Sequence, residues 1–343
     1  MRTSNLGPAL ALLASVAATA CAEKNDAPDG LAAAHPSGGA QIAWNLDARP
    51  FPEIPFPNDV ATRIDATSPT GRRINVSFSG ASDAEEAVRE KINQMTGFGI
   101  VSPIWLKFSA PLDLDNLIAR HAEPVPDFRD DAVYLVNVDP DSDDYGTLVL
   151  LDIGRGNYPI LHDRPGGFFP NDPREHGTNL LYESYEEVDI DGDGELDPIE
   201  DTDDDGVWDH PNVLHPGTDP YVPGNTLEFY ERETNSLIVR PVLPLEPNTT
   251  YAVVLSAALI DEDGLPVDSP FDIINHARQT EALEPLRSIL PAALPERFDA
   301  GLKTVRFAWT FSTQDPTAQL QAVRAGMYGT GALGWLAAQF PPE

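Results

Sequence analysis

Cysteine is almost absent from this chain of 343 residues. The single cysteine, Cys21, excludes a disulfide within the chain, so the fold must be held by a packed core. Basic residues are also scarce, since 22 Lys and Arg stand against 55 Asp and Glu, which gives a formal net charge of −33. Such a surface repels the phosphates of nucleic acid and of anionic lipid but attracts divalent cations. Nucleic acid is therefore not expected as a partner.

The motifs of common catalytic centres are missing as well. The chain has no Walker loop, no H-E-x-x-H motif, no C-x-x-C pair and no G-x-S-x-G nucleophile elbow. The stretch GTGALG at 329–334 matches the dinucleotide-binding fingerprint, but no strand pattern precedes it and only nine residues follow. A βαβ unit cannot form there. We therefore expect no catalytic residues and no enzymatic activity in this chain.

The first 21 residues have the features of an export signal. Arg2 is followed by an uncharged stretch at 6–20, which is too short to span a bilayer. Small residues precede Cys21 in AATAC, and this pattern resembles the signal of bacterial lipoproteins. The resemblance implies that Cys21 is lipidated and becomes the mature N-terminus, and Ala22 behind it favours the outer membrane. The alternative is an ordinary secretory signal that happens to lie near a cysteine.

A lipid at Cys21 would anchor the protein to the membrane by one end only. Residues 22–41 are small and polar, which is typical of a flexible tether. Residues 42–98 are expected to be an extended lead-in followed by one short helix. Within the lead-in, FPEIPFPND at 51–59 alternates proline with apolar residues and predicts an extended segment at the solvent edge.

The short helix is expected within 82–99. Ser82 and Glu85 have the spacing of a capping box, in which each side chain bonds the backbone of the other. Ala84, Val88 and Ile92 fall on one helical face and Gly97 is a stop signal, so we expect one short helix here.

Residues 99–314 carry a series of short strand patterns separated by turn residues. The series predicts a mainly β fold, an antiparallel β-sandwich. Alternation and β-branched or aromatic residues indicate strands at 102–113, 131–138, 146–153, 225–231, 236–245, 249–268 and 305–313. The sequence DEDG at 261–264 is typical of a hairpin turn.

Three stretches of this series resemble a known family. They read IWLKFSAPLDLDNL, LPLEPNTTYAVVLSAALIDEDGLPV and FAWTFST, and they are similar to the bacterial Ig-like domain of the S-layer-associated type. The resemblance implies an Ig-like sandwich. The segment IPFPND, followed by such a module, also looks similar to the N-terminal region of some secreted bacterial lipases. That second resemblance implies an accessory domain of an α/β-hydrolase.

Two insertions interrupt the strand series, and the Ig-like family does not normally carry them. The first, at 154–224, has little β-pattern and contains a dense acidic segment at 189–212. The second, at 271–302, has a helical pattern that we expect to break at Pro285, Pro291 and Pro295. The C-terminal tail at 315–343 predicts one or two further helices.

The acidic segment divides into two copies of twelve residues, DIDGDGELDPIE and DTDDDGVWDHPN. Both have Asp at positions 1, 3, 5 and 9 and Gly at position 6. This is the pattern of a calcium loop, because alternate carboxylates converge on one ion and Gly194 or Gly206 permits the positive φ of the turn. The predicted ligands are Asp189, Asp191, Asp193, the carbonyl of Glu195, Asp197 and Glu200 in the first loop, and Asp201, Asp203, Asp205, the carbonyl of Val207 and Asp209 in the second.

The second loop ends at Asn212, which cannot bind with two oxygens, so its affinity should be weaker. The two loops follow one another without a helix between them. They therefore resemble thrombospondin type-3 or dockerin-like calcium repeats more than an EF-hand pair that opens to bind a target. The alternative is a solvated acidic loop without a metal. Ca²⁺ is preferred because the twelve-residue period preserves both glycines.

These patterns together predict a calcium-binding, lipid-anchored module outside the cytoplasm, with a structural, spacer or binding role. Its protein or polysaccharide partner cannot be read from the sequence. The alternative function is the N-terminal, non-catalytic domain of a secreted esterase or lipase.

Overall fold

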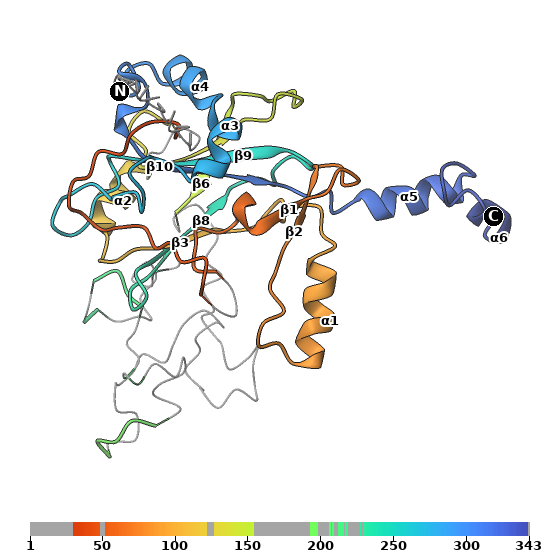
Figure 1. Cartoon of the computed structure of the whole chain (residues 1–343), viewed down its shortest axis with the longest axis horizontal. Helices are drawn as coiled ribbons and strands as arrows, with labels where there is room; N and C mark the ends of the chain where they lie inside the picture. The colour runs from red at the N-terminus through yellow and green to blue at the C-terminus, as the bar shows by residue number, and fades with distance from the viewer. Residues whose placement is uncertain are drawn as a thin grey trace, which may run out of the picture.

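The structure is a computed structural model of the whole chain. It describes residues 30–48, 52–121, 127–153, 193–197, 206, 208, 212–215, 217–218, 227 and 229–341. Two antiparallel sheets form the centre of this part of the chain (Figure 1). The signal segment, Cys21 and residues 22–29 of the tether lie outside the described residues, as does most of the insertion at 154–224. The rest of the tether, residues 30–41, packs on the body, since Leu31 is fully buried and Ala34 N donates to Asp272 O at 2.9 Å. The prediction of a flexible tether is therefore wrong for this part.

The first sheet has four strands in the order β10-β9-β4-β5, and all neighbours are antiparallel. The strands are β4 (Val133–Asn137), β5 (Leu148–Val149), β9 (Thr250–Ser256) and β10 (Val305–Ser312). The register places Val253 of β9 between Trp309 of β10 and Leu135 of β4. Large apolar side chains therefore form a row across the middle of this sheet, which is the cross-strand packing that stabilises sheets.

The second sheet has the order β3-β8-β6, with β7 paired to β8. Its strands are β3 (Ile104–Lys107), β6 (Leu151–Asp152), β7 (Tyr230–Glu231) and β8 (Ser236–Pro241). The single strand predicted at 146–153 is divided between the two sheets, because β5 pairs with β4 whereas β6 pairs with β8. The chain passes from one sheet to the other at Leu150, whose carbonyl accepts from Val242 N at 3.0 Å.

The main hydrophobic core lies between the two sheets. β3 and β8 contribute Leu106 and Val239, and the first sheet contributes Val253, Phe307 and Trp309. In β3 the buried residues alternate with half-buried ones, which shows that one face of this sheet is turned to the core and the other outward. The alternation predicted for this strand is confirmed.

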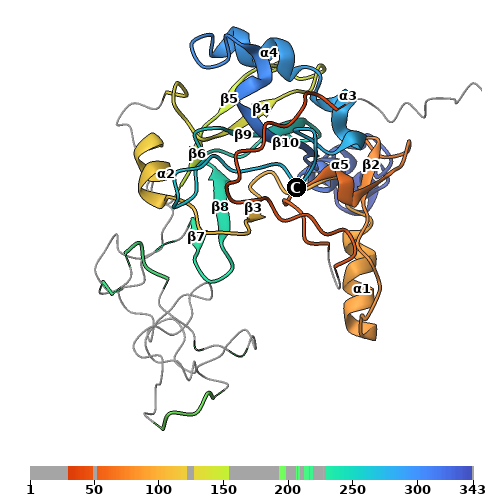
Figure 2. The same cartoon turned by 60° about the vertical axis from the view of Figure 1, so that its left-hand side comes forward.

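Short helices cover the outer face of the first sheet (Figure 2). They are η3 (Ala277–Gln279), α3 (Thr280–Leu283), α4 (Leu286–Ala293) and η4 (Gly301–Thr304). Leu283, Leu286 and Leu290 pack on Tyr134 and Val254 of the sheet. Every residue of β10 is buried as a result, because the strand has the core on one face and helices on the other.

The prolines of this helical layer do not all break it. Pro285 directly precedes α4 and Pro295 follows its end, as predicted. Pro291 lies inside α4, so the break expected there is wrong. The helix is held by the packing of Ile289 and Leu290 on the sheet, and this burial outweighs the backbone hydrogen bond that a proline cannot make.

The composition of secondary structure corrects the predicted fold class. Among the described residues, strands account for 24% and helices for 22%, so "mainly β" is too strong. The architecture is mixed α and β, with open antiparallel sheets. The helices over the first sheet, those at 83–92 and 114–120 and those of the C-terminal tail together account for the difference.

Ile54, Pro55 and residues 57–59 of the lead-in are buried, which corrects the prediction that this segment lies at the solvent edge. Trp309 Nε1 donates to Pro57 O at 2.8 Å, and Gln279 Nε2 donates to Asn58 Oδ1 at 3.2 Å. Asp59 accepts from Ser312 N at 3.0 Å and from Ser312 Oγ at 2.9 Å. Burial raises the pKa of Asp59, against the opposing effect of Arg72 and of Ser312. These polar groups replace the edge partner that β10 lacks.

The remaining small elements surround the sheets. They are η1 (Asp59–Ala61), the hairpin of β1 (Thr62–Ile64) and β2 (Arg72–Ile74), and α2 (Leu114–Arg120). The predicted turn at 261–264 is confirmed, since Gly264 has a φ of +76° and Gly264 N donates to Asp261 O at 2.9 Å. It closes a hairpin of one bridge, Ile260 to Pro266.

The predicted helix α1 (Asp83–Ile92) is present and begins with the expected capping box. Ser82 N donates to Glu85 Oε2 at 2.7 Å, and Glu85 N donates to Ser82 Oγ at 3.4 Å. Val88, on the apolar face of this helix, is 57% exposed. Figure 1 shows α1 extending away from the sheets.

The tail forms two helices, α5 (Ala318–Met327) and α6 (Leu336–Gln339), as predicted. Figure 1 shows that they project from the body at the end of β10. Within the described residues, no helix is both long and apolar enough to cross a membrane.

Candidate functional site

The acidic segment at 189–212 is the candidate metal site predicted from the sequence, and the structure describes part of it. Among the predicted ligands, Asp193, Glu195 and Asp197 are described. The others lie outside the described residues: Asp189, Asp191, Glu200, Asp201, Asp203, Asp205, Val207 and Asp209. Ligation by these residues therefore stays a prediction.

The two glycines at position 6 have the backbone conformation that a calcium loop requires. Gly194 has a φ of +77° and Gly206 a φ of +85°, both in the left-handed region that favours glycine. A Cβ added at either position would meet no atom within 4 Å, so conformation rather than space selects glycine there. The expected positive φ is confirmed at the same position of both copies.

The first loop also shows a local hydrogen bond around its turn. Glu195 N donates to Asp193 Oδ1 at 2.8 Å, which orients the carboxylate of position 5 toward the turn at Gly194. Among the residues that the structure describes, no group of three or more His, Cys, Asp or Glu side chains is arranged to hold a metal ion. Only three of the eleven predicted ligands are within that set.

The segment that follows the second loop is fixed to the body by Asn212. Its Nδ2 donates to Leu227 O at 3.1 Å and to Tyr230 O at 2.8 Å, and its Oδ1 accepts from Arg232 N at 3.2 Å. Asn212 therefore attaches the end of the loop to β7. This agrees with the expectation that position 12 of the second loop supplies no bidentate ligand.

Arg232 completes this attachment. Its Nε donates to Val213 O at 2.8 Å and its Nη2 donates to Leu214 O, so the guanidinium group holds two successive carbonyls of the returning chain. Nη1 lies 3.9 Å from Glu262 Oε1 on the far side. Arg232 thereby connects the returning insertion to the turn at 261–264.

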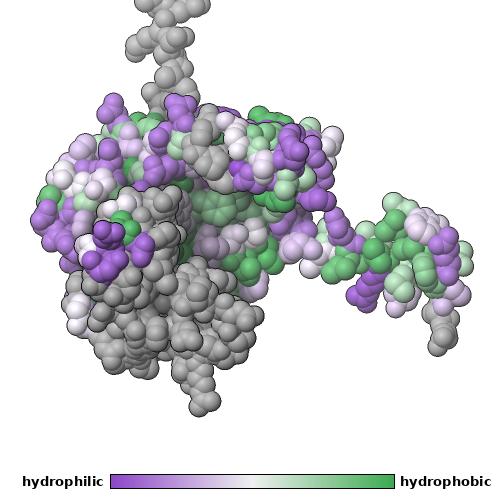
Figure 3. All heavy atoms as spheres, turned by 90° about the horizontal axis from the view of Figure 1, so that it is seen from below, coloured by the Kyte–Doolittle hydropathy of each residue, from purple (hydrophilic) through white to green (hydrophobic). Residues whose placement is uncertain are grey.

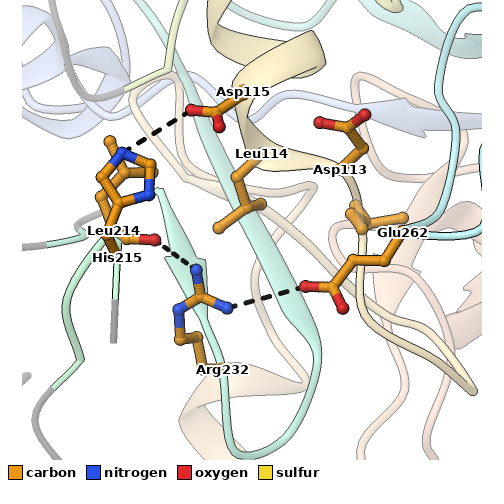
Figure 4. Close-up of a pocket in the computed structure, with 8 residues that line it drawn as sticks. Asp113, Leu114, Asp115, Leu214, His215, Arg232 and Glu262 are labelled. Carbon is orange, nitrogen blue, oxygen red and sulfur yellow. Dashed lines mark hydrogen bonds and ion pairs between the residues drawn. The ribbon is translucent and has the colours of Figure 1, made fainter. Parts of the chain in front are cut away.

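A polar pocket of about 280 Å³ lies at this junction (Figure 4). Asp113, Asp115 and Glu262 bring three carboxylates to it, and Arg232 lies on the opposite side, paired with Glu262. Asp113 also caps α2 by accepting from Asn116 N at 2.9 Å. His215 Nε2 lies 4.0 Å from Asp115 Oδ1, and both side chains are largely exposed to solvent. The contacts of Arg232 make this pocket the place where the returning insertion is attached to the body.

The sequence did not predict this junction. Arg232 is an isolated basic residue between two strand patterns, and its partners come from 213–214 and from 262. Residues separated by about 20 or 30 positions carry no spacing signal that would link them. The excess of acid around a single arginine is visible in the sequence, but it does not indicate which carbonyls that arginine holds.

No family model, no curated protein and no solved structure matches the chain. The function is therefore inferred from the residues of this chain alone.

Proposed function

We propose that the protein is a calcium-binding module outside the cytoplasm, anchored by a lipid at Cys21, in which Ca²⁺ has a structural role. One observation carries the calcium assignment: Gly194 and Gly206 are twelve residues apart and have nearly the same left-handed φ. A solvated acidic run has no reason to repeat this conformation at a fixed period. Calcium loops need it, because the chain must reverse around the ion at position 6.

The physical need for a cation supports the same proposal. Residues 189–212 contain eleven carboxylates and no Lys or Arg, and like charges so close together oppose a compact loop. Oxygen ligands at positions 1, 3, 5, 7, 9 and 12 would suit Ca²⁺, which takes six to eight oxygens. Mg²⁺ is less suitable because it requires strict octahedral geometry and releases its water reluctantly.

The attachment of the insertion explains how calcium could act on the whole domain. Asn212 and Arg232 hold the end of the second loop on β7 and on the turn at 261–264. A loop ordered by Ca²⁺ would therefore be connected to the sheets through a rigid junction. We propose that calcium orders the insertion and that the insertion protects this side of an Ig-like sandwich.

Calorimetric titration of residues 22–343 with CaCl₂ tests the metal assignment. We expect heat of binding, and a melting temperature that falls when a chelator removes the ion, since a ligand bound to the folded state stabilises it. The variants Asp193→Asn and Glu200→Gln should weaken binding. Asp141→Asn is the matched control, because it changes an exposed carboxylate in the acidic run 139–146, which lacks the glycine at position six. Absence of heat, with an unchanged melting curve in chelator, would remove calcium from the proposal.

The lipid anchor has its own test. Growth of cells that express the full chain with labelled palmitate should label the protein, and Cys21→Ser should abolish the label. Fractionation of the envelope should place the labelled protein in the outer membrane. Recovery of the unlabelled chain from the medium would instead indicate an ordinary secretory signal.

The alternative function is the non-catalytic N-terminal domain of a secreted esterase or lipase. The observation in its favour is the burial of 52–59 against β10, because the segment that carries the lipase resemblance is part of the structural framework. The chain alone should not hydrolyse p-nitrophenyl esters. A reading frame with a G-x-S-x-G elbow directly downstream of residue 343 would favour this alternative, and its absence would count against it.

A further inference from the structure

The C-terminal helices form an apolar arm, which we define as residues 316–340. Arg324 is the only charged residue in these 25 positions, in a chain with a formal net charge of −33. On α5, Leu320, Val323 and Met327 are spaced i, i+3 and i+7 and therefore share one helical face. They are 71%, 41% and 48% exposed. Figure 3 shows the arm largely in green, the colour of hydrophobic residues.

The exposed stripe has no partner within the arm. α5 meets the segment before α6 through Gly326, where an added Cβ would lie 2.5 Å from Leu333 O. This contact uses a small residue on a different face from Leu320. The backbone N–H groups of residues 318–340 that donate hydrogen bonds do so to carbonyls of the same arm. The stripe is thus a preformed helical surface with nothing packed on it in the described chain.

The body has an apolar cleft of about 440 Å³. It lies between the lead-in, the β1–β2 hairpin, the end of α1 and β3. Six of the residues that line it are Ile54, Phe56, Ile92, Met95, Phe98 and Trp105. Phe56 is 43% exposed at this site, and Val88, one turn before Ile92 on α1, is 57% exposed. The cleft and the exposed face of α1 together match the groove that an amphipathic helix occupies.

The arm begins at the wall of this cleft. Gln314 N donates to Phe98 O at 2.8 Å, and Thr313 forms a bridge with Phe98. The next residues form an elbow: Asp315 Oδ1 accepts from Thr317 N and from Thr317 Oγ1, both at 2.8 Å. Gln321 Nε2 continues the bracing by donating to Thr317 Oγ1 at 2.6 Å. These hydrogen bonds brace the start of α5, and Figure 1 shows α5 projecting away from the sheets.

We propose that the apolar cleft receives the α5 stripe of a second copy of this chain, so that two copies exchange arms about a two-fold axis. A helix of ten residues is about 15 Å long, enough to reach a facing cleft from a root at the rim of its own. The exchange is self-complementary, since each copy supplies one stripe and one cleft. It also accounts for both unpartnered surfaces at once.

Charge favours a second copy over a membrane as the occupant. α1 carries Asp83, Glu85, Glu86 and Glu90 against Arg89 and Lys91, which is a net charge of −2 beside the cleft. Arg324, the single charge of the arm, complements it. A helix that lies on a membrane usually has many Lys or Arg on its polar face, and the arm has one.

The first experiment measures the mass of residues 22–343 by sedimentation equilibrium across the micromolar range. We expect a dimer, both with Ca²⁺ and with chelator, so the result is separable from the metal assignment. The double variant Leu320→Asp and Val323→Asp should be monomeric with an unchanged circular dichroism spectrum. Ala322→Asp is the matched control, because Ala322 is exposed, lies on the opposite face of α5 and should not disturb the dimer.

The second experiment distinguishes arm exchange from other modes of dimerisation. Val88→Asp changes the exposed face of α1 one turn before Ile92, which lines the cleft, and should also give a monomer. A mixture of the arm variant and the Val88→Asp variant should restore one of the two contacts and form heterodimers. Since residues 22–343 contain no cysteine, a mixture of Met327→Cys chains and Met95→Cys chains should form a disulfide between copies under oxidation.

Three results would overturn the proposal. One is a monomer throughout the concentration range, and another is a dimer that the arm variant leaves intact. The third is a disulfide within one chain that carries both Met327→Cys and Met95→Cys, which would mean that the arm folds back on its own cleft. If the native chain is a monomer that binds phosphatidylcholine vesicles through Leu320, the occupant is a membrane and the proposal is wrong.

Discussion

Strand β10 and helix α5 follow one another in the chain, but β10 is buried and α5 is exposed. VRFAWTFS at 305–312 is buried at every position, whereas in AQLQAVRAGM at 318–327 only Gly326 is buried. Both stretches carry regularly spaced apolar side chains. β10 has a sheet on one face and helices on the other, and α5 has neither. The difference teaches that an apolar pattern specifies the element, while burial depends on what other segments bring to it.

The largest expected contrast is between two tryptophans, Trp309 in β10 and Trp335 in the arm. Trp309→Ala should lower the free energy of unfolding by about 3–5 kcal/mol, since it removes a fully buried ring and leaves Pro57 O without its donor. Trp335 is 54% exposed, so Trp335→Ala should change stability by less than about 0.5 kcal/mol. Urea denaturation at low protein concentration measures both. Equal losses would mean that the arm packs on its own body.

A smaller effect is expected from acid: protonation of His121 should lower the free energy of unfolding by about 3 kcal/mol. Burial lowers the pKa of His121 to about 4, and its Nε2 accepts from Ala132 N at 3.2 Å. The unfolded chain therefore binds a proton at His121 more readily than the folded chain does. The contribution of His121 to stability is fully present above its unfolded pKa of 6.5 and is lost as the pH falls toward about 4.

The replacement His121→Gln keeps an acceptor for Ala132 N and removes the titration. Urea midpoints measured from pH 7 to pH 4 should fall less steeply in this variant than in the native chain. The arm has no comparable buried histidine, so the spectroscopic signal of α5 should not respond over the same range. Identical slopes for the variant and the native chain would show that the pKa of His121 is the same in the folded and the unfolded chain.

The smallest effect concerns α1, which extends from the body as the arm does. Ser82→Ala removes half of the capping box and should cost about 1 kcal/mol of local helix stability. Because α1 packs little on the sheets, the loss should appear as faster hydrogen exchange at 85–93 with an unchanged global melting temperature. Glu85→Gln keeps the reciprocal hydrogen bond and should have a weaker effect. A fall in global stability would instead indicate that α1 is part of the core in solution.

Local patterns in the sequence predicted many of the elements correctly. β3, β4, β8, β9 and β10 lie where alternation and β-branched residues indicated them, and the capping box of α1 is formed. The left-handed φ of Gly194, Gly206 and Gly264 also agrees with the turn or loop predicted at each position. These signals depend on residues within a few positions of each other, so they do not require knowledge of the fold.

The predictions failed where distant segments decide the outcome. The strand expected at 146–153 divides at Leu150 because its halves pair with β4 and with β8. Most of the lead-in is buried because Asp59 and Pro57 accept hydrogen bonds from β10, some 250 positions away. The junction at Arg232 likewise depends on carbonyls at 213–214 and a carboxylate at 262. No local pattern carries such pairings.

The sequence by itself determined the short strands, the turns, the acidic loops with their glycines and the amphipathic helices, because each follows from backbone preference and periodicity over a few residues. The tertiary structure decided which of these elements are buried. β10 is enclosed because a second sheet, the lead-in and the helices of 277–304 meet on it, whereas α1 and α5 keep an apolar face exposed. An element is buried only when another part of the chain packs on it, and that packing depends on contacts between segments far apart in the sequence.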